Sequence, residues 1–300
     1  MVAIQVITES NARIASSLPA GLVAVFAELK ALNPGGEYHY IRNGSSLLEN
    51  VDQACQYIKE REPVTNLLFL SCGTLITGKQ TSEGLNYPMA LAHYSRARFI
   101  VNLLPQLRKA PSLRRVVTVG AGTKEGTIFP DDFQANILGV LSFRGHLTSM
   151  ITLSLAAVAW QAPEVSFVHD YPGFVKTGLP RELTGVAASV SKVVFAPLMA
   201  VLQIPIEETG ERQLYLATTA RFPPRGGSGA EGVAVEEGVS ASAGFDGTPA
   251  GGVYSVDYEA EGPGQKVEET LQNYKKSGMG EKVWNHTEEE FVRITGKLAI

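Results

Sequence analysis

The sequence predicts an α/β fold in which helices flank a parallel sheet that has lost part of its first βαβ unit. Short apolar runs of strand character alternate along the chain with longer segments of helical spacing, the order expected of a parallel sheet covered by helices. The first two strand-like runs, residues 21–26 and 37–41, lie close together. Because a βαβ unit takes about 30 residues or more, the space between them is too short for one.

Residues 1–19 read as a lead-in of mixed polar and apolar character, ahead of the strand expected at 21–26. Residues 27–32 have the character of a helix fragment, and residues 33–36 (Asn-Pro-Gly-Gly) that of a turn. In a dinucleotide-binding fold a glycine-rich turn follows the first strand directly and holds the phosphates at a helix N-terminus. No such turn follows residue 26, so the sequence predicts that the phosphate cradle is absent.

The next segments continue the alternation of helix and strand. Residues 45–62 have helical spacing, with one apolar face made by Leu48, Val51, Ala54, Cys55 and Ile58. Ser45 or Ser46 is the expected N-cap of that helix. Strands are expected at residues 66–73 and 114–122, and a long helix at about 87–109 is ended by Pro111.

A second long helix is expected at about 140–160, followed by a strand over 165–171 that breaks at Pro172 and Gly173. A helix follows at 207–220, and the last strand is expected at 252–258. Residues near 223–252 are rich in Gly, Ser and Ala and predict a mobile surface excursion. Thr287 followed by Glu290 matches the capping box of a terminal helix. We expect a single domain over residues 1–300.

Composition excludes several classes of function. A formal net charge of −4 without any basic run argues against a nucleic-acid partner. No apolar run approaches the roughly 20 residues of a membrane span. The only cysteines, Cys55 and Cys72, lie in apolar surroundings, which favours reduced thiols in a cytoplasmic protein. With the histidines scattered, no spacing indicates a metal site.

The stretch 165–179 resembles the end of a late strand in the short-chain dehydrogenase/reductase family: a strand, then Pro172-Gly173, then Thr177. The resemblance implies a Rossmann-like fold and NADP or NAD as cofactor. In the family the Pro-Gly turn lies against the nicotinamide, which makes Pro172, Gly173 and Thr177 candidate cofactor-binding residues. Ser71-Cys72-Gly73 stands where the family usually has Asn-Ala-Gly along the adenosine side, which adds Ser71 and Gly73 to these candidates.

The resemblance does not extend to the residues that carry the family's chemistry. Gly120-Ala121-Gly122 stands where the catalytic Ser is expected, and Ala92 stands at the position of the Asn. Ser142 and His146 occupy the slots of the Tyr that donates a proton and of the Lys four residues later. They are therefore candidate catalytic residues by position only.

His169-Asp170-Tyr171 is the densest polar cluster at the carboxyl end of a predicted strand, where open α/β sheets bind their ligands. His169 is a candidate general base and Tyr171 a candidate proton donor. Strand alternation places His169 and Tyr171 on one face and Asp170 on the other, which weakens a His–Asp pair. Residues 120–126 mimic a dinucleotide fingerprint, but their spacing favours an ordinary strand-end loop.

Three interpretations of function remain open from the sequence. The first is an oxidoreductase of a small carbonyl or alcohol, similar to fungal dehydrogenase-like proteins of which some belong to secondary metabolism, with an internal segment missing after residue 26. The second is a redox-neutral isomerase or dehydratase that binds no nicotinamide. The third is a non-catalytic scaffold, a pseudoenzyme. The partners expected are a small-molecule substrate and, by analogy with the family, a second copy in a homodimer.

Overall fold

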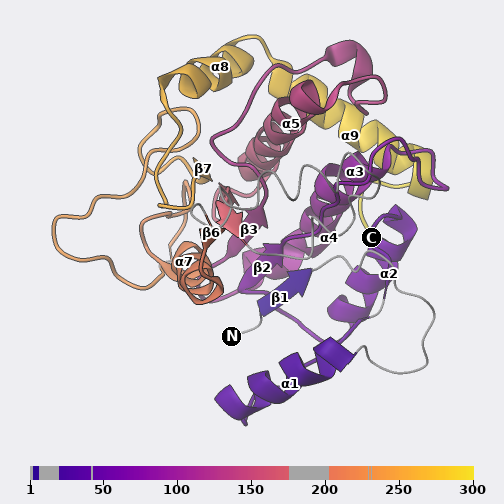
Figure 1. Ribbon diagram of the computed structural model, residues 1–300. Helices are drawn as coiled ribbons and strands as arrows, with labels where there is room; N and C mark the ends of the chain where they lie inside the picture. Colours follow the sequence, from indigo (N-terminus) through magenta and orange to yellow (C-terminus); the bar gives the residue numbers. More distant parts are fainter. Residues whose placement is uncertain (1–2, 7–19, 42, 176–202, 229, 231) are drawn as a thin grey trace.

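The computed structural model describes the chain except for residues 1–2, 7–19, 42, 176–202, 229 and 231 (Figure 1). Its centre is a sheet of strand order β1-β2-β3-β4-β7 in which every pairing is parallel. The strands are β1 (Ala3–Val6), β2 (Leu67–Leu70), β3 (Arg115–Val119), β4 (Ser166–Asp170) and β7 (Val253–Val256). A short parallel pair, β5 (Phe174–Val175) and β6 (Gln203–Ile204), lies outside this sheet. The predicted parallel α/β fold is confirmed.

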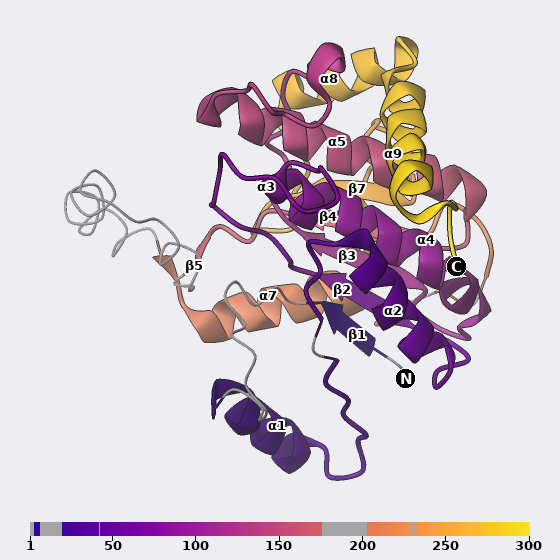
Figure 2. The same ribbon diagram turned by 90° about the vertical axis from the view of Figure 1, so that its right-hand side faces the viewer.

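Helices cover both faces of the sheet (Figure 2). One face is covered by α2 (Leu48–Lys59), α4 (Ser95–Lys109), α5 (Val140–Gln161) and α9 (Met279–Thr295), and the other by α7 (Ile206–Thr218). Ahead of α4 run α3 (Tyr87–Met89) and a π-helical turn η1 (Ala90–Tyr94), which together make the helix expected at 87–109. The other helices of the described residues are α1 (Ala20–Leu32), α8 (Gln265–Lys276) and the 3₁₀ turn η2 (Pro130–Asp132). Within the described part of the chain, no helix has both the length and the apolar character that crossing a membrane requires.

Burial explains the strand sequences. Every residue of β4 and of β7 is buried, as expected of strands in a parallel sheet that helices cover on both sides. Side chains of β4 alternate between the two layers. Phe167 packs in the cluster that includes α4, α5 and α9, whereas Val168 packs in the cluster beneath α7.

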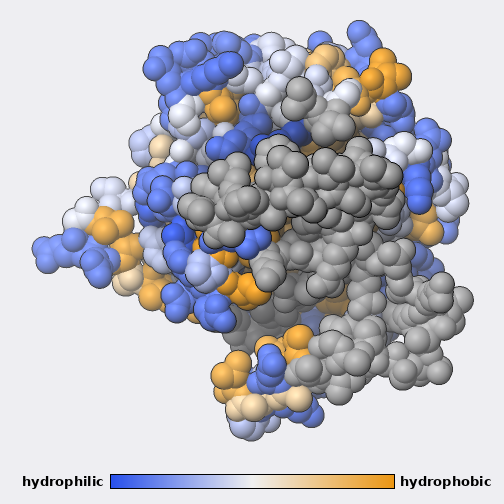
Figure 3. Space-filling model, in the orientation of Figure 1, coloured by the Kyte–Doolittle hydropathy of each residue, from blue (hydrophilic) through white to orange (hydrophobic). Residues whose placement is uncertain are grey.

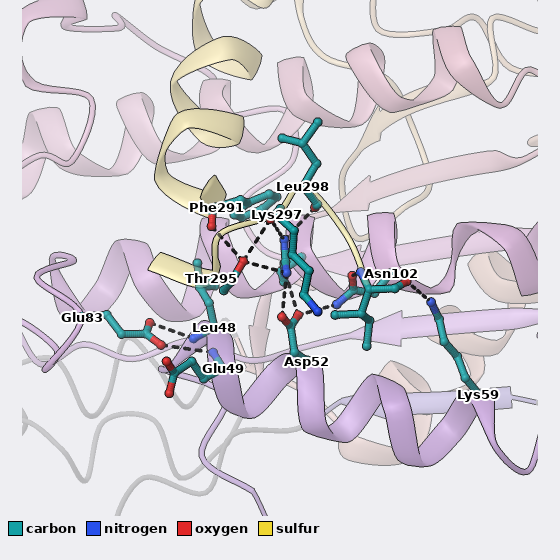
Figure 4. A network of polar contacts seen from close by, with 12 residues as sticks. Leu48, Glu49, Asp52, Lys59, Glu83, Asn102, Phe291, Thr295, Lys297 and Leu298 are labelled. Carbon is teal, nitrogen blue, oxygen red and sulfur yellow. Dashed lines mark hydrogen bonds and ion pairs between the residues drawn. The ribbon is translucent and has the colours of Figure 1, made fainter. Parts of the chain in front are cut away.

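Helix α2 buries the five residues that its spacing predicted, so its apolar face is confirmed. Its expected N-cap is wrong. The helix starts after Leu47 without a side-chain cap of its own, and the carboxylate of Glu83 accepts the N–H groups of Leu48 and Glu49 at 2.8 and 3.1 Å (Figure 4). A carboxylate at this end also suits the helix dipole. The cap therefore comes from a remote loop, which local sequence cannot show.

A buried ion pair ties the end of the chain to α2 and α4 (Figure 4). Arg98, fully buried, donates to both carboxylate oxygens of Asp52 at 2.6 Å. The same guanidinium donates to the carbonyls of Lys297 and Leu298 at 2.9 and 2.6 Å and to the hydroxyl of Thr295 at 3.0 Å. All three nitrogens of Arg98 thus have partners, which is the condition for burying such a charge.

Two strand predictions near the N-terminus are wrong. Residues 21–26 belong to helix α1, and residues 37–41 join no strand of the sheet. A short apolar run does not by itself distinguish strand from helix, and here the run continues without a break into Ala, Leu, Glu and Lys, which favour helix. The first strand is instead β1, inside the stretch read as a lead-in.

The capping box proposed for Thr287 is also wrong. Thr287 lies in the middle of α9, buried, where its hydroxyl donates to the carbonyl of Val283 at 2.8 Å. The helix begins after Gly278, which has a left-handed φ of 70°. Residues 223–252 have neither helix nor long strand in their described part. That they form a mobile surface excursion stays a prediction.

Candidate active site at the carboxyl ends of the strands

The carboxyl ends of β2, β3 and β4 meet at one edge of the sheet because these strands are parallel neighbours. β2 leads to Ser71–Gly73 and β3 to Gly120–Gly122, while β4 leads to Tyr171 and Pro172. Ser71, Gly73 and Pro172 are half-buried at this edge. Thr177 lies outside the described residues. The structure thus brings most of the predicted site residues to the same edge.

His169 belongs to a buried hydrogen-bonded relay that its sequence neighbours did not reveal. The hydroxyl of Thr152 on α5 donates to Oε1 of Glu125 at 2.7 Å and lies 2.9 Å from Nδ1 of His169. Because that hydroxyl hydrogen is used, Nδ1–H of His169 must be the donor to Thr152. Nε2 is then an acceptor, and the N–H of Ala121 points at it from 3.4 Å.

Glu125 connects this relay to the last strand. Its Oε1 also accepts from the hydroxyl of Ser255 on β7 at 2.6 Å, and Ser255 in turn accepts the N–H of Thr123 at 2.7 Å. The other oxygen, Oε2, has no hydrogen-bond partner among the described residues. Burial raises the pKa of Glu125. The relay fixes the loop 120–126 against β4, β7 and α5.

Arg96 crosses the ends of β2 and β3. Its Nε donates to the carbonyl of Cys72 at 3.1 Å, a bond that Nη2 shares, and Nη1 donates to the carbonyl of Val119 at 2.7 Å. Burial, and secondarily the charge of Arg96, lower the pKa of His169 to about 3. At neutral pH His169 is therefore uncharged, with the Nε2 lone pair directed to the turn that begins at Gly120.

Gly120 stands where the family has its catalytic Ser, and packing explains why no side chain is present there. A Cβ on Gly120 would lie 2.7 Å from Nε2 of His169, well inside van der Waals contact. A Cβ on Gly122 would collide with the carbonyl oxygens of His169 and Val256. The buried imidazole therefore occupies the space that a side chain at residue 120 would need.

We expect Gly120→Ser to lower the free energy of unfolding by about 1–3 kcal/mol, because the new side chain overpacks against His169. His169→Ala removes the obstacle, so the double variant should be more stable than the sum of the two single changes predicts, with a coupling of about 0.5–3 kcal/mol. Denaturant unfolding of the four proteins measures this cycle. Additive changes would show that His169 does not exclude a side chain at residue 120.

Asp170 points to the opposite layer, as strand alternation predicted. Its Oδ2 accepts from Nε2 of Gln213 on α7 at 2.7 Å, and Oδ1 has no partner among the described residues. Asp170 therefore does not orient His169. Burial raises the pKa of Asp170 to about 7.

The shift gives a pH dependence of stability with a definite sign. The folded state holds the Asp170 proton more tightly than the unfolded chain does, so stability falls as pH rises from 3.8 to about 7. The side chain of the Asp170→Asn variant cannot ionise. As pH rises through this window, the free energy of unfolding of the wild type should therefore fall relative to that of the variant. Unfolding by denaturant at several pH values tests this. Parallel pH profiles of the two proteins would contradict it.

Tyr171 is half-buried between two cations at the sheet edge. Nζ of Lys124 lies 5.5 Å and Cζ of Arg144 lies 5.4 Å from the centre of its ring, and Phe174 meets the ring edge-on at 6.4 Å. Lys124 and Arg144 are exposed, and among the described residues neither has a carboxylate within ion-pair distance. Such cation–π contacts fix the ring in place.

Ser142 and His146, the other predicted candidates, lie on the first turns of α5. Ser142 is exposed. His146 is buried and holds the preceding loop, because its Nδ1 accepts the N–H of Phe129 at 3.2 Å and its Nε2 lies 3.0 Å from the carbonyl of Phe133, to which it donates. Burial lowers the pKa of His146. Arg144, between these two residues, is the part of α5 that contacts Tyr171.

Gly173 makes a close approach, although to this chain's own side chains. Its φ is +77°, and a Cβ there would lie 2.5 Å from Cδ1 of Ile204 and 3.3 Å from the ring of Tyr258. The position therefore requires glycine for its backbone conformation and for this packing.

The residues that sequence analysis missed are Thr152, Glu125, Ser255 and Arg96. Thr152 and Ser255 sit in apolar segments and resemble ordinary core hydroxyls. The one local signal of Glu125 is its position, since it is a carboxylate within the turn of small residues at 120–126. Only the fold brings these four side chains to His169 and to the ends of β2 and β3.

Two hollows of the described structure bear on where a ligand could bind. A cavity of about 10 Å³, lined by Arg96, Thr118, Ser154 and Trp284 among others, is large enough for a single water. A broader open groove of about 500 Å³ runs along α7 past Arg212, Tyr215 and Tyr258. In the described part of the chain no three His, Cys, Asp or Glu residues are grouped to hold a metal ion.

Comparison with known proteins places the chain among fungal oxidoreductases. It is 35% identical to an oxidoreductase of Emericella nidulans over 87% of this chain and 79% of the relative. It is 31% identical to an oxidoreductase of Aspergillus flavus over 98% and 87%, in an alignment of 336 positions. It is 28% identical to a short-chain dehydrogenase/reductase of Stachybotrys chartarum over 88% and 78%. No family model matches the chain.

Among solved structures, an NADPH-bound carbonyl reductase from chicken fatty liver superposes with a TM-score of 0.48 at 12% identity, over 85% of this chain and 84% of that one. A 7α-hydroxysteroid dehydrogenase in complex with NADH and a 7-oxo bile acid superposes with a TM-score of 0.47 at 12% identity, over 73% and 80%.

Proposed function

Because the chain belongs to the short-chain dehydrogenase/reductase family of oxidoreductases, we propose that it interconverts a small carbonyl compound and its alcohol at the carboxyl edge of the sheet. The relatives are named as oxidoreductases or as a dehydrogenase/reductase, and these names favour redox chemistry over the redox-neutral and the non-catalytic interpretations. We also propose, from the resemblance to the family, that the substrate is a small molecule, that the protein forms a homodimer and that it acts in secondary metabolism.

The observation that carries the proposed site is Tyr171. It is a phenol at the end of a central strand, half-buried and flanked by Lys124 and Arg144. The family's chemistry needs a group that gives a proton to, or takes one from, the substrate oxygen. Ser142 and His146 stand where the family has its Tyr and Lys. Tyr171, directly after β4, is therefore the phenol proposed to exchange that proton.

The other residues have supporting roles in this proposal. Nε2 of His169 accepts a hydrogen bond at the turn beside the substrate, and Thr152 and Glu125 hold that tautomer. Lys124 and Arg144 position the Tyr171 ring. His146 holds the loop that leads into α5, the helix that carries Arg144, and so helps to position Arg144 at the site. Ser142 stays a candidate only because it stands at the position of the family's Tyr.

NADP or NAD is the cofactor that family membership implies, with Ser71, Gly73, Pro172, Gly173 and Thr177 as its proposed contacts. The described residues fit that group poorly. The space beside Gly173 is taken by Ile204 and Tyr258, and no glycine-rich turn follows the first strand.

The test is a steady-state screen of small aldehydes and ketones with NADPH or NADH, in which the alcohol is quantified by mass spectrometry. The proposal expects at least one carbonyl to be reduced at a rate proportional to protein concentration. A matched control uses the same protein after thermal denaturation. Absence of any alcohol across the panel would refute the proposed activity.

A further inference from the structure

The strand order bears directly on how much of a dinucleotide this chain can hold. A dinucleotide lies across the crevice at the point where the strand order of a doubly wound sheet reverses, with one half of the sheet under each nucleotide. The described sheet runs β1-β2-β3-β4-β7 in chain order and has no reversal. Among the described residues β1 is therefore the edge, and no second half of the sheet lies beyond it.

The connection after β1 also lacks the features of a phosphate site. Residues 7–19, which link β1 to α1, contain no glycine. A phosphate site needs the helix N-terminus to lie against the sheet. Residues 27–35, at the other end of α1 and beyond it, are all exposed.

Helix α1 stands apart from the sheet in Figures 1 and 2. Figure 3 shows apolar side chains gathered on it, and Val25, Leu29 and Leu32 are 46%, 38% and 85% exposed. An apolar helix of a folded domain normally buries such side chains against a neighbouring element. Here that neighbour is missing from the described part of the chain.

The relatives supply an independent observation. The alignment with the Aspergillus flavus oxidoreductase runs over 336 positions, although this chain has only 300 residues. The relative therefore carries residues that have no counterpart here. A missing strand and helix would account for the absent reversal of strand order and for the uncovered side chains of α1.

We infer that this chain gains no binding energy from the adenosine and pyrophosphate half of a dinucleotide. Any nicotinamide carrier is held by its mononucleotide end alone, at the ends of β3 and β4. The inference rests on the proposed function only for the existence of that mononucleotide site. It follows that NADPH, NADH and reduced nicotinamide mononucleotide bind this chain with similar affinity.

Isothermal titration of the 300-residue chain with each of these three compounds tests the inference. We expect dissociation constants within about threefold of one another, a difference of less than 1 kcal/mol. A preference of about tenfold or more for NADPH or NADH over the mononucleotide would overturn it. If none of the three binds, the mononucleotide site and the nicotinamide part of the proposed function both fail. A preference for the dinucleotides alone overturns the inference and leaves the proposed function intact, so the two failures are distinguishable.

A chimera provides the complementary measurement. The segment of the Aspergillus flavus relative that has no counterpart in this chain is inserted at the position where the alignment of the two sequences opens its longest gap. We expect the chimera to bind NADPH or NADH at least about tenfold more tightly than the mononucleotide. A folded chimera, judged by circular dichroism, that still binds the three compounds alike would contradict the assignment of the missing half to this segment.

Discussion

Arg98→Met is expected to lower the free energy of unfolding by about 3–5 kcal/mol, because it leaves a partly buried carboxylate without its partner. Asp52 would lose two charge-assisted hydrogen bonds of 2.6 Å. The carbonyls of Lys297 and Leu298, which cap the turn after α9, would lose their donor as well. Denaturant unfolding followed by circular dichroism measures the change.

Arg108→Met is the matched control, since Arg108 lies on the same helix in a half-exposed ion pair with Glu164. Such surface pairs contribute about 0–1 kcal/mol. If Arg98→Met does not fold, Arg98→Lys, which keeps a positive charge beside Asp52 but loses the paired hydrogen bonds of the guanidinium, should still show a smaller loss. A cost for Arg98→Met no larger than that for Arg108→Met would contradict the structural role given to this pair.

Tyr171→Phe is expected to lower the rate of carbonyl reduction by about 10²–10⁴-fold, the usual contribution of a positioned acid or base. The ring and its contacts with Lys124 and Arg144 survive the change, so the fold should not be affected. The rate constant kcat should fall while KM for the carbonyl stays within about threefold. The reason is that proton transfer from Tyr171 stabilises the transition state and not the bound substrate. Steady-state kinetics on the carbonyl found by the screen give both constants.

Tyr57→Phe is the control for this prediction. Tyr57 on α2 also carries a cation over its ring, Arg61 at 3.5 Å, and it lies on a helix away from the strand ends. Its substitution should leave kcat unchanged. Equal rates for wild type and Tyr171→Phe would remove Tyr171 from the reaction and return Ser142 as the candidate proton donor.

The central and C-terminal parts of the fold could be predicted from sequence because their signals are local and long. The apolar face of α2 follows from helical periodicity, and the buried strands β3, β4 and β7 follow from short runs rich in β-branched and aromatic residues. The errors occurred where local sequence is ambiguous. Residues 21–26 fit either a strand or a helix, and the Thr287–Glu290 pattern lies inside α9, where packing against the core overrides a capping signal.

The candidate site was predicted in part, for a similar reason. His169 and Tyr171 stood out because they end a strand that breaks at Pro172. The relay through Thr152, Glu125 and Ser255 joins a helix, a loop and the last strand, which only the tertiary fold brings together. The requirement for glycine at residue 120 also depends on the tertiary fold, which brings the imidazole of His169 against that position.

The central claim is that substrate binds at the carboxyl edge of the sheet and not in the larger groove along α7. Backbone chemical-shift mapping by NMR, with a carbonyl substrate added to the deuterated protein, tests this most directly. The account predicts shift changes at Gly73, Ala121, Gly122 and Tyr171, which end β2, β3 and β4. Shift changes confined to Arg212, Tyr215 and Tyr258 would place the substrate in the α7 groove and contradict it.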